Sequence, residues 1–385
     1  MFAIPLAWLQ LFREKMRLLI ALAGIGFAVI LMFIQLGFQD ALFTSAVSLH
    51  TSMQGDIFLI SPQSTALIAM RSFSDRRLYQ AYGYPGVESI SPIYLGFGFW
   101  KNPVNQRTRS ILVIGIDPSE PVLSSELVPN LAPIQLPDVV LFDDKSRAEF
   151  GPVADLFNQN KTVETEVSGR RVTVGGLFSL GASFGADGNI ITSDLNFLRI
   201  FNQREKGLID VGMVRVKPGT DVEETLKAMR SQIQDVTNDV RIFSKAEFIK
   251  FEEDYWRSST AIGFIFTLGT AIGFLVGTVI VYQILYTDIT DHLAEYATLK
   301  AMGYKNSYLL SVVFQESLIL SFLGYIPGFC LAIALYNVTR NATLLPIEMT
   351  MNRAIVVLFL AVIMCVISGA IAVRKVQDAD PADIF

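Results

Sequence analysis

Residues 261–286 read AIGFIFTLGTAIGFLVGTVIVYQILY, an apolar run of 26 residues without a charged side chain. The hydrocarbon core of a membrane is about 30 Å thick and is crossed by roughly 20 helical residues, so this run is long enough to span it. Three further apolar runs are also long enough to span it: Leu18–Phe38, Tyr308–Tyr336 and Ala354–Val373. Within the four runs, Glu316 is the one charged residue. The sequence therefore predicts an α-helical membrane protein with four transmembrane helices.

The composition of the chain separates it from ordinary soluble proteins. Of its 385 residues, 51% are hydrophobic and 17% are charged, whereas about 25% of the residues of a soluble domain are charged. The formal net charge of −5 argues against nucleic acid as a partner, because such partners select a basic surface. A lipid bilayer is the expected surrounding of the chain.

Sequence motifs give no indication of an enzyme. No Gly-Lys dipeptide occurs, so the phosphate-binding loop G-x-x-x-x-G-K-[ST] is absent, and H-E-x-x-H is absent as well. Cys330 and Cys365 lie in apolar runs, and His50 and His292 are far apart in sequence. We therefore expect no catalytic, cofactor or metal site in this chain.

Basic residues indicate how the chain is oriented in the membrane. They occur directly before the first apolar run and directly after the last one. These residues are Arg13, Lys15, Arg17, Arg374 and Lys375. After the first run no Lys or Arg occurs before Arg71. Because cytoplasmic flanks are enriched in Lys and Arg, we expect both termini in the cytoplasm and residues 39–260 outside it.

Residues 39–260 are long enough to form a domain with its own hydrophobic core, and they contain no cysteine. Short segments that are rich in β-branched and aromatic residues, bounded by Pro, Gly or Asp, predict strands. These segments are Asp56–Ser61, Glu88–Trp100, Ser110–Ile116, Asp138–Phe142, Arg171–Phe178 and Asn189–Thr192. A β-α-β pattern occupies Ile209–Phe243. The sequence therefore predicts a large α+β domain between the first and second spans.

Two helices are expected to join this domain to the spans. Gln39–Met53 continues from the first run without Gly or Pro, and Lys245–Trp256 leads from a Ser244 cap toward the second run. We expect both to be stalk helices that are continuous with the spans. Such stalks suit the transmission of motion across the membrane boundary, and a passive binding ectodomain is the alternative.

Glycines recur every four residues in two of the runs. They are Gly269, Gly273 and Gly277 in the second run, and Gly324 and Gly328 in the third. This spacing places small residues on one helix face, where another backbone can approach closely. For the second run, a dimer contact and packing within one chain are equally consistent with the pattern, and we assign the face to the dimer. Pro327 predicts a kink in the third run.

Glu316 lies about two helical turns from the cytoplasmic end of the third run. Acidic residues within membranes are often functional, so a proton-relay role is one interpretation. The sequence shows no second acid or base inside the spans to accept a proton. We therefore favour an interaction of Glu316 with a cytoplasmic helix.

The loop between the second and third runs contains a predicted amphipathic helix, Asp291–Met302, which ends at Gly303. Its apolar side, including Leu293 and Leu299, fits a groove on another protein. An interfacial helix that lies on lipid is the alternative for this segment, and it is the preferred interpretation of the segment before the first run, where Trp8 and its neighbours recur at helical spacing.

These features resemble the MacB/FtsX-type permeases of ABC transporters, which have a type VII architecture. The order of one span, a large ectodomain and three spans covers the whole chain. Residues 295–304, EYATLKAMGY, resemble the coupling helix E-x-x-x-L-(K/R)-A-x-G of that family. The resemblance assigns ATPase coupling to Glu295, Leu299, Lys300, Ala301, Met302 and Gly303. Glu316-Ser317 and Asp380-Pro-Ala382 also resemble family patterns.

Within the family, the segments Pro5–Leu11, Gly55–Leu59 and Leu136–Phe142 and the pair Tyr296-Ala297 resemble the cyanobacterial DevC permeases. The resemblance implies a homodimer in the inner membrane with its large domain in the periplasm. It further implies a cytoplasmic ABC ATPase that holds ATP and magnesium, a periplasmic adaptor of the membrane-fusion type and a TolC-like outer-membrane duct. The expected function is efflux by mechanotransmission, with export of a lipid or glycolipid cargo.

The expected domain organisation follows from these interpretations. An N-terminal interfacial helix and the first span occupy 1–38, the periplasmic domain with its stalks 39–260, and the second span 261–286. The coupling helix lies in 287–307, the last two spans in 308–373 and a cytoplasmic tail in 374–385. A lipoprotein-releasing permease of the LolC/LolE type is the alternative function, and an FtsX-like regulator of cell-wall hydrolases is disfavoured because its ectodomain would be much smaller.

Overall fold

The computed structural model describes residues 15–302, 304 and 306–377. These residues divide into two compact units. The helical unit takes its residues from 1–41, 261–342 and 347–385, and the α/β unit from 42–260 and 343–346. Residues 1–14, which hold most of the expected interfacial helix, and the motif at 380–382 lie outside the described residues.

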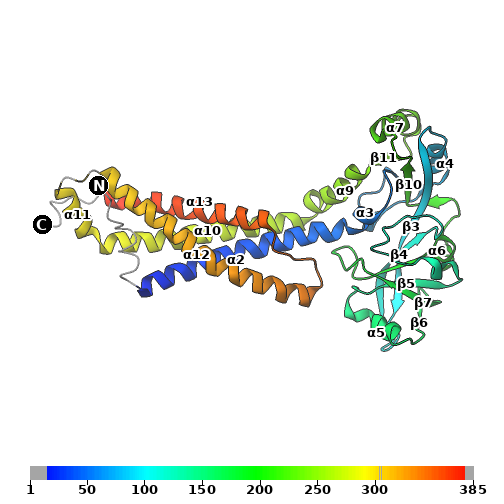
Figure 1. Cartoon of the computed structure of the whole chain (residues 1–385), viewed down its shortest axis with the longest axis horizontal. Coiled ribbons are helices and arrows are strands. Elements are labelled where there is room, and N and C mark those ends of the chain that lie inside the picture. The colour runs from blue at the N-terminus through cyan, green and yellow to red at the C-terminus, as the bar shows by residue number, and fades with distance from the viewer. Residues whose placement is uncertain (1–14, 303, 305, 378–385) are drawn as a thin grey trace. The chain divides into compact units, whose positions relative to one another are not determined.

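The helical unit is built from four long apolar helices, which Figure 1 shows side by side. They are α2 (Lys15–Ala46), α10 (Ala261–Asp291), α12 (Asn306–Thr343) and α13 (Met351–Gln377). Each contains a stretch that is long and apolar enough to cross a membrane, which confirms the four predicted spans. A helix satisfies its backbone hydrogen bonds internally, as the bilayer core requires. Large apolar side chains such as Phe264 and Phe359 are exposed on this unit, as lipid-facing residues are.

Glycines bring α2 and α12 into close contact. Gly26 of α2 lies against Gly324 and Gly328 of α12, and a Cβ atom added to Gly328 would come within 3.0 Å of the Gly26 carbonyl oxygen. A Cβ atom added to Gly324 would lie 2.6 Å from the Cβ atom of Ile25. Small residues are what such an approach needs. The glycine spacing of the third run therefore marks its contact with the first.

The glycine face of α10 packs within one chain. Gly269 and Gly273 face α2, and Gly277 faces both Ala28 of α2 and Met364 of α13. A Cβ atom at Gly273 would touch Leu31 and Met32, and one at Gly277 would come within 2.6 Å of the Ala28 Cβ. α2 of the same chain therefore occupies space beside these glycines, as the packing alternative expects, and a contact of this face with a second copy stays a prediction.

A polar cluster joins α2, α12 and α13 at the end of the helical unit where α13 begins. Arg353, which is buried, donates from Nε to Asp40 Oδ2 at 3.1 Å and from Nη1 to the Glu348 carbonyl at 2.6 Å. Its guanidinium group also lies 5.5 Å from the centre of the Tyr336 ring. Because the Arg353 charge has both an ionic and a backbone partner, its burial is compensated.

The α/β unit is built on a nine-stranded sheet with the strand order β11-β1-β10-β3-β4-β8-β5-β7-β6. Its strands are β1 (Ile57–Ile60), β3 (Val87–Lys101), β4 (Thr108–Ile116), β5 (Val139–Asp143), β6 (Glu164–Val167), β7 (Arg170–Phe178), β8 (Asn189–Ser193), β10 (Val211–Val216) and β11 (Arg241–Ser244). A separate pair joins β2 (Phe73–Ser74) to β9 (Leu208–Ile209). The connecting helices are α3 (Ser48–Ser52), α4 (Arg76–Tyr82), α5 (Val153–Asn158), α6 (Asp194–Ile200), α7 (Val222–Met229), α8 (Asp235–Thr237) and α9 (Lys245–Asp254). All the strands predicted in the ectodomain are present, which confirms the α+β prediction.

The long strand β3 belongs to two parts of the sheet. Its first half pairs with β10, and its second half pairs with β4. Trp100, near its end, also pairs with Val167 of β6, so the path from β3 through β4, β8, β5, β7 and β6 closes on itself. In the predicted β-α-β segment, β10 and β11 are both antiparallel to β1, which lies between them.

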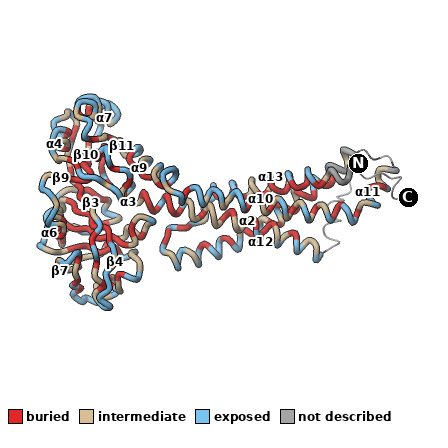
Figure 2. The backbone as a smooth tube through the Cα atoms, turned by 180° about the vertical axis from the view of Figure 1, so that it is seen from behind, coloured by how far each residue is buried: buried red, intermediate tan, exposed pale blue. Residues whose placement is uncertain are grey.

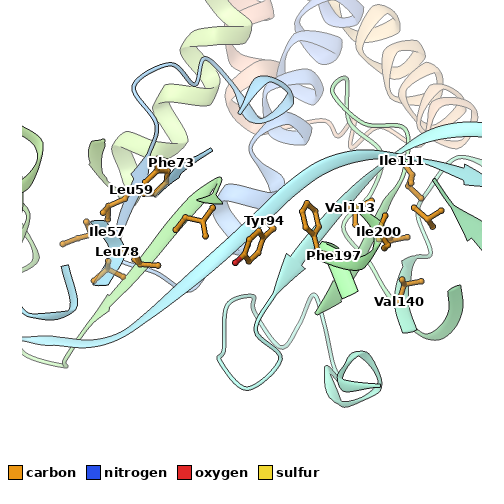
Figure 3. Packing of buried hydrophobic residues seen from close by; sticks show 14 of the residues in the cluster. Ile57, Leu59, Phe73, Leu78, Tyr94, Ile111, Val113, Val140, Phe197 and Ile200 are labelled. Atoms are coloured by element: carbon orange, nitrogen blue, oxygen red, sulfur yellow. The ribbon is translucent and has the colours of Figure 1, made fainter. Parts of the chain in front are cut away.

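Both faces of the sheet carry a hydrophobic core, which Figure 2 shows as buried stretches along the strands. On one face, Tyr94 of β3 packs against Phe197 of α6 with ring centres 5.5 Å apart, as Figure 3 shows. On the other face, Phe58 stacks on Phe248 of α9 at 4.8 Å. Burial of these side chains stabilises the unit without any disulfide.

The first expected stalk is helical. α2 extends past the apolar run to Ala46, and α3 resumes after the single residue Val47. Hydrogen bonds from Val47 N to Phe43 O and from Thr51 N to Val47 O, at 3.2 and 2.9 Å, keep the helical pattern through this residue. The helix therefore continues to Ser52 with one local distortion.

The second expected stalk is interrupted before the second span. α9 ends at Asp254, a π-helical turn covers Tyr255–Ser259, and Thr260 is extended with φ −119° and ψ 152° before α10 begins. The prediction that this stalk is continuous with the span is therefore wrong. Ser and Thr hydroxyls compete with the helical ladder, and the Thr260 hydroxyl donates to the Trp256 carbonyl at 2.9 Å.

The packing of α10 on α2 makes a testable prediction for two glycines. Gly277→Ala is expected to destabilise the chain by about 1–3 kcal/mol, because its new methyl group meets the backbone-fixed Cβ of Ala28. Gly269→Ala is the matched control, since its methyl group meets only the flexible end of Gln35. Thermal unfolding of the purified chain in detergent measures both. Equal effects, or loss of a dimer without loss of stability at Gly277→Ala, would contradict the packing within one chain.

Candidate functional site

The candidate site lies in the helical unit, where the end of α10 meets a short helix, α11 (Leu293–Ala301). The helix predicted for Asp291–Met302 is shorter at both ends, because Asp291 still belongs to α10 and Met302 caps α11. His292 forms the turn between the two helices. Its backbone N–H donates to the Asp288 carbonyl at 3.1 Å, and its ring Nδ1 lies 2.9 Å from the same oxygen. These contacts fix the point at which α11 leaves α10.

The predicted coupling residues differ in exposure along α11. Glu295 and Met302 are exposed, whereas Leu299 and Lys300 are half-buried. Ala297 is fully buried, so it anchors α11 to the helical unit. The side chain of Ala301 and the whole of Gly303 lie outside the described residues. A helix is therefore present in the predicted segment, and Leu299 is half-buried rather than exposed on it, while the coupling role of these residues stays a prediction.

An apolar surface occurs instead at the end of α11. Met302 is 63% exposed and Tyr304 is 47% exposed. The backbone N–H of Tyr304 donates to the Leu299 carbonyl at 3.1 Å, which closes the helix, and its ring lies 4.9 Å from the ring of Tyr308. A partner that binds α11 therefore meets a Met and a Tyr side chain held at its carboxyl end.

An arginine from α2 connects to this site. Arg17 donates from Nη1 to Asp288 Oδ1 at 3.4 Å and from Nη2 to Asp291 Oδ2 at 2.5 Å. Asp288 also lies 3.7 Å from the His292 ring, measured from Oδ1 to Nδ1. Asp288 is buried and Asp291 is exposed. Arg17 thus holds the start of α2 against the last turn of α10, beside the turn that positions α11.

Glu316 of α12 lies in the same cluster. Its side chain is fully buried and interacts with the Asp288 side chain. Among the described residues, neither Glu316 oxygen receives a hydrogen bond from a donor meeting ordinary geometry. The neighbour of Glu316 is thus an acid of α10, and the favoured interaction with the cytoplasmic helix predicted for Asp291–Met302 stays a prediction. α12, α10 and α2 therefore meet at one buried polar point next to α11.

The sequence interpretation missed three members of this cluster: Arg17, Asp288 and His292. Arg17 was read only as a topology signal, and His292 as an isolated histidine. The spacing of Asp288 and His292, four residues apart at the end of an apolar run, indicates one helix face and was the available signal. Their contacts with Arg17 and Glu316 join distant segments, which periodicity does not reveal.

The sequence interpretation overlooked one enzyme-like motif, which lies in the α/β unit. Residues 181–185 read GASFG, which fits the G-x-S-x-G pattern of a nucleophile elbow. That pattern requires a strand-turn-helix context, whereas this segment is a loop between β7 and β8. The Ser183 hydroxyl accepts hydrogen bonds from the backbone of Gly185 and Ala186 at 3.2 and 3.1 Å. The Ser183 hydroxyl therefore stabilises the loop, and it does not have the strand-turn-helix setting of a nucleophile elbow.

The described part of the chain contains no group of three or more His, Cys, Asp or Glu residues that could hold a metal ion. Asp288, His292 and Glu316 are thus a polar contact between helices. This contact fixes the positions of the helix ends relative to one another.

Comparison with known families gives two matches that together cover most of the chain. Residues 18–232 match the MacB-like periplasmic core domain, and residues 261–381 match the FtsX-like permease C-terminal family. The chain belongs to the MacB/FtsX-like family of ABC transporter permeases. The MacB-like match covers most of the α/β unit but ends before β11 and α9, and α10, α11, α12 and α13 fall in the FtsX-like match. No curated protein matches the chain.

Solved structures that resemble the chain come from related transport proteins. The periplasmic region of MacB from Actinobacillus actinomycetemcomitans is 10% identical, with 52% of this chain and 92% of that one covered and a TM-score of 0.36. The extracellular domain of the noncanonic ABC-type transporter YknZ from Gram-positive bacteria is 14% identical, with 49% and 98% covered and a TM-score of 0.33.

The two ion pairs of Arg17 are expected to differ in strength. In double-mutant cycles, Arg17→Met with Asp288→Asn should show a coupling above about 1 kcal/mol, because one partner is buried. The cycle with Asp291→Asn is the matched control and should give about 0.2–1 kcal/mol, since the exposed pair is screened by solvent although its distance is shorter. Thermal unfolding of the full chain in detergent measures both. A larger coupling for Asp291 would contradict the cluster described for Asp288.

Proposed function

We propose that this permease is the membrane subunit of an ABC exporter and that a separate cytoplasmic ATPase docks on α11. The observation that carries the proposal is the carboxyl end of α11, where Met302 and Tyr304 are exposed, while His292 fixes the opposite end of the helix against α10. ATP and magnesium belong to the partner, because this chain lacks the phosphate-binding loop. Membership of the permease family supports this division of roles.

Movement of α11 is passed into the helical unit through the buried cluster. His292 adjoins Asp288, and Asp288 contacts both Arg17 of α2 and Glu316 of α12. A displacement of α11 therefore acts on three long helices at once. α2 extends to Ala46 and supplies residues to both units, so it is the continuous element through which motion reaches the periplasmic domain.

The remaining features of the exporter follow from the family and the sequence. Basic residues before the first span and after the last support cytoplasmic termini and a periplasmic α/β unit in the inner membrane. The proposed assembly contains two copies of this chain, a periplasmic adaptor and a TolC-like outer-membrane duct. The resemblance to DevC permeases supports a lipid or glycolipid cargo.

Docking of the ATPase is tested by a charge on the exposed end of α11. Met302→Asp is expected to weaken binding of the ATPase at least tenfold, because the carboxylate is buried without a partner in the contact. Leu299→Asp tests the half-buried position and is expected to have the smaller effect on binding unless it also unfolds α11. Co-purification and binding assays with the ATPase subunit measure the loss, and ATP hydrolysis should appear only when that subunit is present.

Ala294→Asp is the matched control for docking. It adds the same charge at an exposed position in the first turn of α11, where a negative charge favours the helix. Normal ATPase binding by Met302→Asp, or equal loss by the control, would show that the α11 end is not the contact. Contact of α11 with lipid would then be the better interpretation.

The two connections between units are expected to differ in their tolerance of flexibility. A short run of glycines inserted after Ala46 should abolish export while ATP hydrolysis continues, because it breaks the helical pattern that runs through Val47. The same insertion after Thr260 is the matched control and should retain export, since the chain is already extended there. Export measured at equal ATPase rate distinguishes them. Normal export by the Ala46 variant would mean that α2 does not transmit the stroke.

The cellular role is tested by the periplasmic protein that crosslinks to the chain. An elongated adaptor supports efflux. A lipoprotein carrier would instead support a LolC/LolE-like releasing permease, and an activator of cell-wall hydrolases would support an FtsX-like regulator.

A further inference from the structure

A histidine without hydrogen-bond partners is buried in the α/β unit, where α3 packs against α9. His50 of α3 is fully inaccessible to solvent, and neither ring nitrogen has a hydrogen-bond partner among the described residues. Its ring packs on Phe248 of α9 with centres 4.5 Å apart. An unpaired imidazole in an apolar site cannot carry a charge cheaply. Burial accordingly lowers the pKa of His50 from 6.5 to about 3.

An acidic side chain faces this histidine. Glu252 of α9 is 1% exposed, and its Oε2 lies 3.7 Å from His50 Nε2. Glu252 Oε2 accepts the Leu67 backbone N–H at 2.7 Å, and Oε1 accepts the Trp256 indole N–H at 2.9 Å. Burial outweighs these two donors and raises the pKa of Glu252 from 4.5 to about 7. At pH values between those of the two groups, His50 and Glu252 are both uncharged.

The charged groups on neighbouring elements are engaged elsewhere. Lys245 at the start of α9 donates to the Met53 carbonyl at 2.6 Å. Arg241 of β11 lies over the Phe243 and Phe251 rings, and Arg257 lies over the Phe43 ring at 4.8 Å. Within the described residues, His50 is the titratable group at ion-pair distance from Glu252. Burial is therefore the main cause of the pKa shifts of both side chains.

The location of the pair gives it a role beyond packing. α3 follows α2 in the chain, and α9 leads toward α10, so the pair joins the two segments through which the α/β unit is connected to the spans, as the element labels in Figure 1 show. The Glu252 carboxyl also binds Leu67 and Trp256, and Trp256 lies near the glycine-rich loop at Gly185. Separation of α3 from α9 would therefore expose this cluster to water.

We propose that His50 and Glu252 form a latch between α3 and α9 that is packed as an uncharged pair, with a proton on Glu252, and opens as an ion pair, with that proton on His50. On opening, the O–H bond of Glu252 breaks and an N–H bond forms on His50, so no proton enters or leaves the pair. The transfer occurs because, in water, imidazole is a stronger base than carboxylate. The latch does not depend on the identity of the ATPase or the cargo.

This arrangement predicts an opening equilibrium that is insensitive to pH. Near pH 5.5 the packed pair carries a proton on Glu252 and the open pair carries one on His50, so both states bind about the same number of protons. Linkage makes the pH dependence zero when the proton counts are equal. The free energy needed to separate α3 from α9 then stays nearly constant while the external pH varies.

Replacing either His50 or Glu252 should make the opening equilibrium depend on pH, and the two replacements should have opposite effects. In His50→Gln, Glu252 is uncharged when packed and ionised when open, so the packed state loses stability and opening rises about fiftyfold from pH 4.5 to 6.5. In Glu252→Gln, His50 is uncharged when packed and protonated when open. The packed state then gains stability as pH rises, and opening falls about fiftyfold over the same range.

Hydrogen exchange of the full-length chain in nanodiscs measures the opening. Peptides covering residues 48–53 and 245–256 are followed at pH 4.5, 5.5 and 6.5, with rates corrected for intrinsic exchange at each pH. Peptides from β4 and β8 serve as the folding reference. The unmodified chain should vary by no more than about twofold, while the two variants should diverge in opposite directions.

The outcomes decide the proposal. Flat profiles in all three proteins would overturn it, because the pair would then be packing without titration. A strong pH dependence in the unmodified chain would also overturn it, since the pair would gain or lose a proton on opening. If His50→Gln disturbs the reference peptides, His50→Phe supplies the same test with an aromatic ring against Phe248. Agreement in sign between the His50 and Glu252 variants would exclude the transfer.

Discussion

Close backbone approach along α2 is the contact on which the helical unit depends. Lipid offers apolar surroundings to a separated helix as readily as a neighbouring helix does, so burial alone gives little reason for helices to associate in a membrane. Dispersion contacts at short range provide the stabilisation instead. α2 obtains them from both neighbours, through Gly26 against α12 and through the glycines of α10. The side chains that would separate these helices are absent at the crossing points, and polar contacts can then form at either end of the unit.

Those polar contacts have different geometries at the two ends. At one end Arg353 is buried among Asp40, a backbone carbonyl and the Tyr336 ring, which compensates its charge fully. At the other end Arg17 is partly exposed and the acidic groups outnumber it. A cluster in which every charge has a partner favours one fixed arrangement. A cluster with more acidic than basic side chains can exchange ion-pair partners at a lower cost in free energy. The second kind lies beside α11, the helix on which we propose that the ATPase docks.

Much of this architecture could be predicted from the sequence, because it depends on local pattern. The length of the apolar runs predicted the four spans. Short segments rich in β-branched and aromatic residues, bounded by Pro, Gly or Asp, predicted the strands of the ectodomain. The break at Thr260 was missed, since nothing in the run of polar residues before it distinguishes a distorted helix end from a continuing helix. Other contacts connect residues that are far apart in the chain. They are the packing of Gly269, Gly273 and Gly277 and the contacts of Arg17 with Asp288 and of His50 with Glu252. Such contacts exist only once the tertiary fold is formed, so a single sequence contains no direct signal for them.

The path of β3 has a consequence for how the α/β unit behaves among other chains. Exposed strand edges offer unpaired N–H and C=O groups to any extended segment, and so they are sites of aggregation. In the nine-stranded sheet, the pairing of β6 with Trp100 of β3 turns one potential edge back into the sheet. The opposite edge is β11, whose Arg241–Ser244 span is short and begins with a charged residue. The domain can therefore fold beside a crowded membrane surface with little sheet edge open to a second chain.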